Sequence, residues 1–199
     1  MLSQLRPAFV LLILFAALTG LVYPLAITGI AQAVFPRQAN GSLVEKNGTV
    51  IGSELIGQNF ADAKYFWPRP SATSDTDPAD ATKTVSAPYN AASSSGANKG
   101  PTSKDLMERL EETVGKLRGD SKDLKVPVDL ATASSSGLDP HISPDAAAFQ
   151  VPRVARARGL TEAQVSALVA NATEGRTFGL LGEPRVNVLQ LNLSLDARP

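Results

Sequence analysis

The chain has 199 residues, with 19 basic and 19 acidic side chains and a formal net charge of zero. This length suits one domain, or one domain with an appendage. The balanced charge excludes a strongly basic nucleic-acid-binding protein, so we expect no nucleic acid as a partner. The chain has no cysteine and a single histidine, His141. These counts exclude a disulfide scaffold, a thiolate metal site, a cysteine nucleophile and a histidine-rich metal site.

The N-terminal region carries a long apolar run, with no charged residue between Arg6 and Arg37. At 1.5 Å per residue, a helix over this run would be about 45 Å long, which exceeds the thickness of a bilayer core. We therefore predict a short tail at 1–7 and a transmembrane helix at Ala8–Val34, which makes the lipid bilayer a partner. Proline removes one helical hydrogen bond, so a kink is expected at Pro24.

Two alternatives for this run remain open. Ala31-Gln32-Ala33 resembles a signal-peptide cleavage site, although the apolar stretch is too long for a signal peptide. A buried core helix is disfavoured by the same length.

The orientation of the helix is predicted from its flanks. The basic residues on its two sides are nearly equal in number, but long domains translocate largely regardless of charge. We therefore expect the N-terminus inside and a soluble domain at 35–199 outside, in the periplasm.

The first elements of this domain are a hairpin and a loop. Leu43–Lys46 and Thr49–Ile51 are predicted strands, joined by Asn47-Gly48, the preferred pair for a type I′ turn. The segment 74–103 is rich in Ser, Ala, Thr, Asp, Pro and Gly, so we predict a long flexible loop. Its aspartates at 75, 77 and 80 are interpreted as a solvated acidic stretch, since a calcium loop would need more oxygen ligands and a defining glycine.

Helices and strands are both predicted in the remaining chain. Helices are expected at Lys104–Arg118, from Ser143-Pro144-Asp145 to Arg158 with a bend or break at Pro152, and from the capping box Thr161–Gln164 onward. Strands are expected at Val126–Thr132 and Val186–Leu195. The mixture predicts an α+β fold, with one N-terminal transmembrane helix followed by a single mixed α/β soluble domain.

The densest polar segment is Ser134–His141, with three hydroxyls, a glycine, a carboxylate and the imidazole. Free backbone amides beside the next helix start could hold an anion or a phosphate. The alternative is an ordered turn in which side chains satisfy the backbone. A serine hydrolase with His141 as the base is a third reading, but the sequence has no G-x-S-x-G elbow.

Two further clusters have a structural and a functional interpretation. Arg153, Arg156 and Arg158 could bind phosphate or an acidic partner, or could form intramolecular pairs or face solvent. The aromatic segment Tyr65–Trp67 is interpreted as packing in a core or an interface. No P-loop is present, because the glycine-rich segment 96–100 lacks the required spacing.

The chain resembles the C subunit of the bacterial potassium-transporting P-type ATPase, the KdpC family. The resemblance covers most of the chain, in ordered blocks. The main ones are Gly20–Pro24, Gln38–Ser42, Leu55–Gln58, Arg69–Thr73, Pro88–Asn90, Pro127–Leu160 and Pro184–Val188. Departures are an insertion at Ser74–Ala87 and the residues Ala97 and Lys99, where the family tends to have a serine and an apolar residue.

This resemblance implies a non-catalytic accessory subunit of a high-affinity, ATP-driven potassium-uptake complex in the bacterial inner membrane. Its implied partners are a channel-like potassium-binding subunit, an ATP-hydrolysing subunit and a small fourth subunit. The family subunit is proposed to raise the ATP affinity of the hydrolysing subunit. On this chain, that proposal assigns nucleotide binding to Ser134, Ser135, Ser136, Gly137 and Gln150, with ATP as a ligand available through the complex and no metal.

The implied ATP contact conflicts with the expected topology, because a domain outside the membrane cannot touch cytoplasmic ATP. An indirect effect would need a two-state element that both sites bias. Two other functions remain as alternatives: a periplasmic cap that filters or gates potassium entry to the channel-like subunit, and a membrane-anchored hydrolase.

Overall fold

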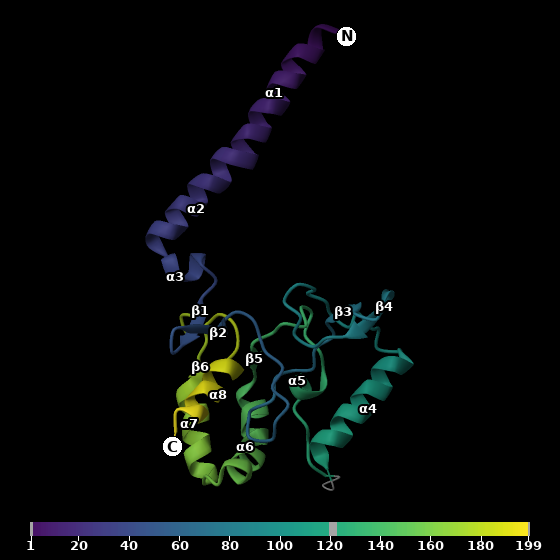
Figure 1. Cartoon of the computed structure of the whole chain (residues 1–199), viewed down its shortest axis with the longest axis vertical. Coiled ribbons are helices and arrows are strands. Elements are labelled where there is room, and N and C mark those ends of the chain that lie inside the picture. The colour runs from purple at the N-terminus through teal and green to yellow at the C-terminus, as the bar shows by residue number, and fades with distance from the viewer. Residues whose placement is uncertain (1, 120–122, 199) are drawn as a thin grey trace. The chain divides into compact units, whose positions relative to one another are not determined.

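A computed structural model describes residues 2–119 and 123–198 of the chain (Figure 1). The chain divides into two compact units, Met1–Ser53 and Glu54–Pro199. The hairpin that the sequence analysis assigned to the soluble domain therefore belongs to the first unit. The second unit begins at Glu54, and the fold is α+β, as predicted.

The first unit begins with one continuous apolar helical stretch, Leu5–Val34, long and apolar enough to cross a membrane. The stretch comprises three successive helical segments, α1 (Leu5–Ala17), the π-helical η2 (Leu18–Val22) and α2 (Tyr23–Val34), and a short 3₁₀ turn, η1 (Leu2–Gln4), precedes it. The stretch starts three residues earlier than the predicted Ala8. No residue in its most apolar window is buried, so its side chains need an external apolar environment.

The π-helical segment lies directly before Pro24, where a kink was expected. Proline has no N–H group, so the carbonyl four residues earlier cannot receive its usual helical hydrogen bond. In the structure the Tyr23 N–H group bonds instead to the carbonyl of Leu18, five residues back. Such a π turn is one known response of a helix to a disturbed hydrogen-bond ladder.

The rest of the first unit confirms the predicted hairpin. After α3 (Pro36–Ala39), strands β1 (Leu43–Lys46) and β2 (Thr49–Ser53) pair antiparallel. Asn47 and Gly48 have positive φ angles of 55° and 75°, as a type I′ turn requires.

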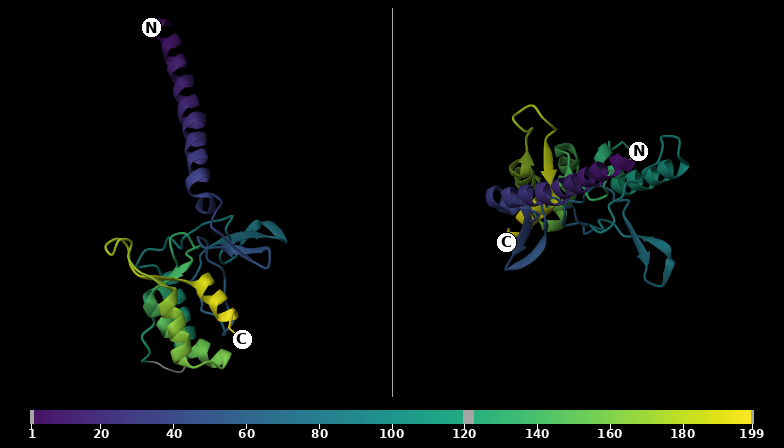
Figure 2. Two further views of the ribbon diagram at one scale, coloured as in Figure 1. Left: turned by 90° about the vertical axis from the view of Figure 1, so that its left-hand side faces the viewer. Right: turned by 90° about the horizontal axis from the view of Figure 1, so that it is seen from above.

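The second unit has its core around helices α6 and α7 and the C-terminal helix α8 (Figures 1 and 2). Its elements are β3 (Ser74–Asp77), β4 (Asp80–Ser86), α4 (Lys104–Arg118), α5 (Val128–Ala131), β5 (His141–Ile142), α6 (Pro144–Arg158), α7 (Glu162–Ala172), β6 (Thr173–Glu174), β7 (Arg185–Asn187) and α8 (Val188–Asp196). Strands β5, β7 and β6 form a small antiparallel sheet in that order.

Three helix predictions are confirmed, together with the predicted ends of α4 and α6. Helix α4 ends at Gly119. Helix α6 begins at Ser143, whose hydroxyl accepts a hydrogen bond from the Ala146 N–H group, and ends at Gly159 in the left-handed conformation. Helix α7 has the predicted capping box. Helix α6 runs through Pro152 as one element, so the predicted break at this proline does not occur.

Three other predictions were wrong. The segment 74–103 contains the hairpin β3–β4 at its start, so it is not loop throughout. Val126–Thr132 holds the short helix α5 instead of a strand. Val186–Leu195 is a strand only to Asn187, where the Asn187 side chain accepts a hydrogen bond from the Gln190 N–H group and starts α8. An N-cap of this kind outweighs the apolar alternation that indicated a strand.

Candidate functional site

The polar turn Ser134–His141 lies against two segments that are distant in sequence. The Ser95 N–H group donates to the carbonyl of Ser136 at 2.9 Å, and the Ser71 hydroxyl donates to the carbonyl of Gly137 at 2.7 Å. The turn therefore joins the chain before β3 to the chain after β4.

Two glycines permit this close approach. A Cβ atom on Gly137, whose φ is +67°, would lie 2.6 Å from both the Ser95 carbonyl oxygen and Thr73 Cγ2. A Cβ atom on Gly96 would lie 2.7 Å from the Ser135 carbonyl oxygen. Neither distance is tolerable, because side-chain carbons do not approach other heavy atoms so closely.

The hydroxyls of the turn satisfy backbone amides within it. Ser134 Oγ accepts from the Gly137 N–H group at 2.9 Å, and Ser136 Oγ accepts from the Leu138 N–H group at 3.1 Å. Ser134 is buried, and Ser135 is the one serine of the three that is exposed. The amides of Gly137 and Leu138 are thus already bonded, which matches the ordered-turn alternative and leaves neither amide free for a phosphate.

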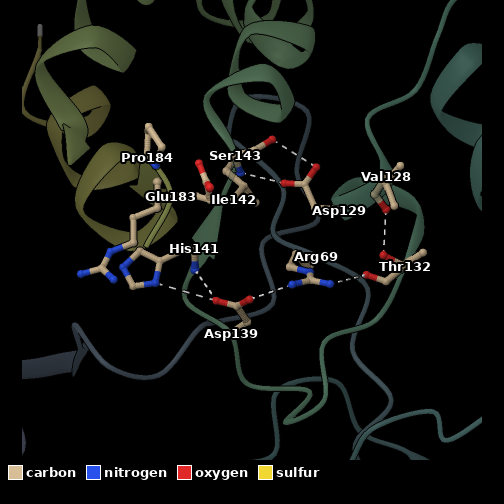
Figure 3. Close-up of a pocket in the computed structure, with 11 residues that line it drawn as sticks. Arg69, Val128, Asp129, Thr132, Asp139, His141, Ile142, Ser143, Glu183 and Pro184 are labelled. Atoms are coloured by element: carbon tan, nitrogen blue, oxygen red, sulfur yellow. Dashed lines mark hydrogen bonds and ion pairs between the residues drawn. The ribbon is translucent and has the colours of Figure 1, made fainter. Parts of the chain in front are cut away.

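A cavity of about 390 Å³ adjoins the turn, with charged side chains from several elements on its walls (Figure 3). Arg69 Nη1 lies 3.0 Å from Asp139 Oδ2. The other oxygen of Asp139 accepts from the backbone N–H group of His141 at 3.0 Å. Across the cavity, Asp129 accepts from the backbone N–H and the hydroxyl of Ser143 at the start of α6. Both carboxylates therefore bind backbone amides and would repel an anion there.

His141 lies on the wall of this cavity beside Asp139. Its ring is half-buried, and its Nδ1 lies 3.8 Å from Asp139 Oδ1. Burial lowers the pKa of His141, and the positive charge of Arg185 lowers it further. Within residues 2–119 and 123–198, no serine hydroxyl hydrogen-bonds to this ring, so the described chain gives the hydrolase reading no nucleophile–base pair.

Gln150 has a different environment from the serine turn. Its side chain, 1% exposed, exchanges two hydrogen bonds with the backbone of Trp67: Oε1 accepts from the Trp67 N–H group at 2.7 Å, and Nε2 donates to the Trp67 carbonyl at 3.1 Å. Gln150 is not among the residues that line the cavity beside Ser134–Ser136. Within the part of the chain that the structure describes, the side chain of Gln150 forms no hydrogen bond to the turn. The five predicted nucleotide-binding residues therefore have two separate surroundings.

Asn192 of α8 binds the backbone of Phe66, the residue before Trp67, in the same way. The sequence analysis did not identify this residue. Its Oδ1 accepts from the Phe66 N–H group at 2.8 Å, and its Nδ2 donates to the Phe66 carbonyl at 3.0 Å. The sequence could have indicated Asn192, because it is an amide residue between Leu191 and Leu193 in the C-terminal segment. A buried amide there needs hydrogen-bond partners for both of its polar atoms. Phe66 itself is fully buried, which confirms the core interpretation of the aromatic segment.

Two of the three arginines on α6 bind within the domain. Arg153 donates to the carbonyls of Ala63 and Tyr65 and stacks 3.8 Å above the Trp67 ring. Burial lowers the pKa of Arg153 to about 10. Arg158 donates to Asp196 at 2.7 Å. Arg156 is exposed. The intramolecular alternative therefore holds for Arg153 and Arg158.

The acidic residues of the β3–β4 hairpin also bind neighbouring backbone. Asp77 accepts from the Ala79 N–H group, and Asp80 accepts from the Thr82 N–H group and hydroxyl. Among the residues described, no three His, Asp or Glu side chains gather closely enough to hold a metal ion.

These observations define a class: an α+β domain carried by one apolar helix of membrane-spanning length. Comparison with known sequences shows to which family of such proteins the chain belongs. Residues 5–197 match the family model KdpC, described as the K⁺-transporting ATPase, c chain, and the chain belongs to this family.

Curated relatives match this chain along nearly their full length. The chain is 65% identical over 197 residues to a potassium-transporting ATPase KdpC subunit of Rhodopseudomonas palustris, covering 99% of this chain and 98% of the relative. It is 64% identical over 196 residues to the protein of the same name in Bradyrhizobium diazoefficiens, covering 98% of each. A third, in Methylorubrum extorquens, is 60% identical over 195 residues, covering 98% of this chain and 97% of the relative.

Proposed function

We propose that this chain is a non-catalytic accessory subunit of a high-affinity, ATP-driven potassium-uptake complex in the bacterial inner membrane. The observation that carries the proposal is the helical stretch Leu5–Val34, which exposes apolar side chains along its whole length. Only lipid and the helices of other membrane subunits can cover such a surface. The relatives' name, a subunit of a potassium-transporting ATPase, supports the same assignment.

The proposed role of the helix is to hold the chain in the complex. Its partners in this proposal are a channel-like potassium-binding subunit, an ATP-hydrolysing subunit and a small fourth subunit. Gly20 and Gly29 leave open space where a Cβ atom would stand, so another helix can approach the backbone closely at both positions.

The proposed effect on ATP affinity is indirect. The amides of Gly137 and Leu138 and the side chain of Gln150 are occupied by bonds within the domain. The proposed orientation, with the N-terminus inside and the domain in the periplasm, separates them from cytoplasmic ATP. We therefore assign the subunit's influence on nucleotide affinity to assembly and stabilisation of the complex.

The test is removal of the soluble domain from the assembled complex. A chain truncated after Ser53 should reach the membrane but abolish potassium uptake at micromolar potassium, and an epitope tag reports its insertion. Normal uptake by cells containing only the truncated chain would overturn the proposal. In purified complexes, an altered apparent potassium affinity with unchanged ATP affinity would indicate a cap over the potassium entrance instead.

A labelling experiment tests the orientation. The chain has no cysteine, so Ser135→Cys introduces a single thiol at the exposed serine of the turn. A small membrane-impermeant thiol reagent should label this variant in intact cells, with lysed cells as the reactivity control. Protection in intact cells followed by labelling after lysis would place the turn inside, overturn the proposed orientation and remove the topological argument against direct nucleotide contact at Ser134–Gly137.

A further inference from the structure

The apolar arm, residues 173–187, is a hairpin-like extension that projects from the second unit (Figure 2). It consists of β6, a long loop and β7, with Glu174 paired to Arg185 at its base. At its tip, Phe178 is 90% exposed, Leu180 79% and Leu181 64%. An exposed cluster of large apolar side chains on a soluble domain marks an interaction site more often than scattered single residues do.

Hydrogen bonds within the turn hold the tip of the arm together. Thr177 and Leu181 exchange two backbone hydrogen bonds of 2.9 Å, and the amides of Gly179 and Leu180 bond to carbonyls within the same turn. Phe178 has a φ of +55°, an unfavourable conformation for a bulky residue. A preformed turn that holds an aromatic side chain outward loses little conformational entropy when it binds.

The charges of the arm cancel one another. Arg176 pairs with Glu183 at 2.7 Å, and Arg185 pairs with Glu174 at 3.0 Å. Attachment to an anionic lipid surface relies on an excess of basic residues, which this arm does not have. A partner surface that fits the tip of the arm is therefore apolar, and its rim carries no net charge.

The size of the tip also limits its occupant. Three side chains of this kind expose on the order of 400 Å², whereas a stable independent interface needs about 800 Å² from each partner. The tip is therefore too small to hold two copies of this chain together by itself. It suits a partner that another contact already keeps nearby, because a linked second contact is formed at high effective concentration.

The base of the arm lies beside the start of the second unit. Asn187 Nδ2 donates to the Glu54 carbonyl at 2.9 Å, and Glu54 follows the first unit directly in the chain. The base of the arm is therefore bonded to the first residue of the second unit.

We propose that the apolar arm inserts Phe178, Leu180 and Leu181 into an uncharged apolar socket on the extramembrane surface of another protein subunit held at the same membrane. This inference rests on the proposed function, which supplies a complex for the helix to join. The helix provides the first contact, and the arm provides a second contact with defined geometry.

The test places a photo-crosslinking phenylalanine derivative at position 178 of the full chain in the native membrane. Illumination should produce a covalent adduct with one other subunit, identified by mass spectrometry. Adducts with lipid alone, with a second copy of this chain, or with nothing would overturn the inference. Co-purification of the unilluminated chain with the complex is scored separately, so its failure counts against the proposed function and not only against the arm.

A pair of substitutions supplies an independent readout. Asparagine tolerates positive φ, so Phe178→Asn should leave the melting temperature of the purified chain unchanged or higher. The same variant should dissociate from the detergent-solubilised complex at least tenfold faster than the unaltered chain. Met107→Gln, at an exposed apolar residue of α4, is the matched control and should dissociate at the original rate. Equal dissociation rates for both variants would contradict the proposal.

Discussion

Gln150 and Trp67 are joined by two hydrogen bonds, one to each polar group of the Trp67 backbone. A glutamine side chain on α6 thereby binds an extended segment in the manner of a neighbouring strand. Asn192 on α8 does the same for Phe66. The two buried amides together fix the aromatic segment between two helices, which gives Gln150 a structural role independent of any nucleotide.

Substitution of Gln150 should therefore reduce stability. Gln150→Leu leaves the backbone groups of Trp67 without partners and should lower the free energy of unfolding by about 2–3 kcal/mol. Urea unfolding of the purified full chain in detergent measures this change. Asn192→Leu is the matched variant, since the resemblance assigns it no nucleotide contact. A variant of Gln150 with unchanged stability and reduced ATP affinity of the complex would show that the structural explanation is wrong.

Gly137→Ala and Gly159→Ala should lower the free energy of unfolding by different amounts, although both glycines have nearly the same backbone conformation. Their φ angles are +67° and +66°, so each substitution carries the left-handed penalty of about 1 kcal/mol. Only at Gly137 would the new methyl group collide with Ser95 and Thr73, while nothing lies within 4 Å at Gly159. We expect Gly137→Ala to lose about 2 kcal/mol more, measured by thermal melting. Equal losses would mean that the serine turn is not packed as described.

Arg153→Ala should destabilise the domain, and Arg156→Ala should not. Arg153 donates to the carbonyls of Ala63 and Tyr65 and stacks on Trp67, contacts that together contribute about 2–4 kcal/mol. Arg156 is exposed, so its removal should change stability by less than about 0.5 kcal/mol. Chemical denaturation of both variants tests the difference. A larger effect of Arg156→Ala would indicate that this arginine has a partner within the domain.

The stability of the domain should fall on mild acidification because of His141. Burial and Arg185 lower the pKa of His141 in the folded chain below its ordinary value of 6.5. The unfolded chain therefore binds the proton more readily, and stability decreases as the pH falls from about 6.5 towards the lower folded pKa. His141→Gln should reduce the change in melting temperature between about pH 7.5 and pH 5.5. An unchanged pH dependence in this variant would exclude His141 as the cause.

The helices were predictable where local signals were complete. Ser143-Pro144-Asp145 specifies a helix start through its own side chains, and Gly159 specifies the end, so no distant contact was needed. The strand predicted at Val186–Leu195 was wrong because alternating leucines also fit a buried helix that is covered on several sides. The cap at Asn187 and contacts with α7 decide between the two.

The candidate site was only partly predictable. The sequence indicated that Ser134–His141 is a polar turn, but not that Ser71 and Ser95 would bind its carbonyls. It also placed Gln150 beside basic residues without revealing its bonds to Trp67. These partners lie far along the chain, and no local pattern reports which distant backbone groups a side chain will meet.

The sequence by itself determined the apolar membrane-spanning stretch, the turn at Asn47-Gly48 and the family to which the chain belongs, since each depends on the order and type of neighbouring residues. The tertiary structure alone decided that Gln150 binds Trp67 and that Phe178 stands exposed at the tip of an arm. The physical reason is that exposure and hydrogen-bond partners are set by which segments pack together. Packing joins residues whose separation in the chain carries no record of their contact.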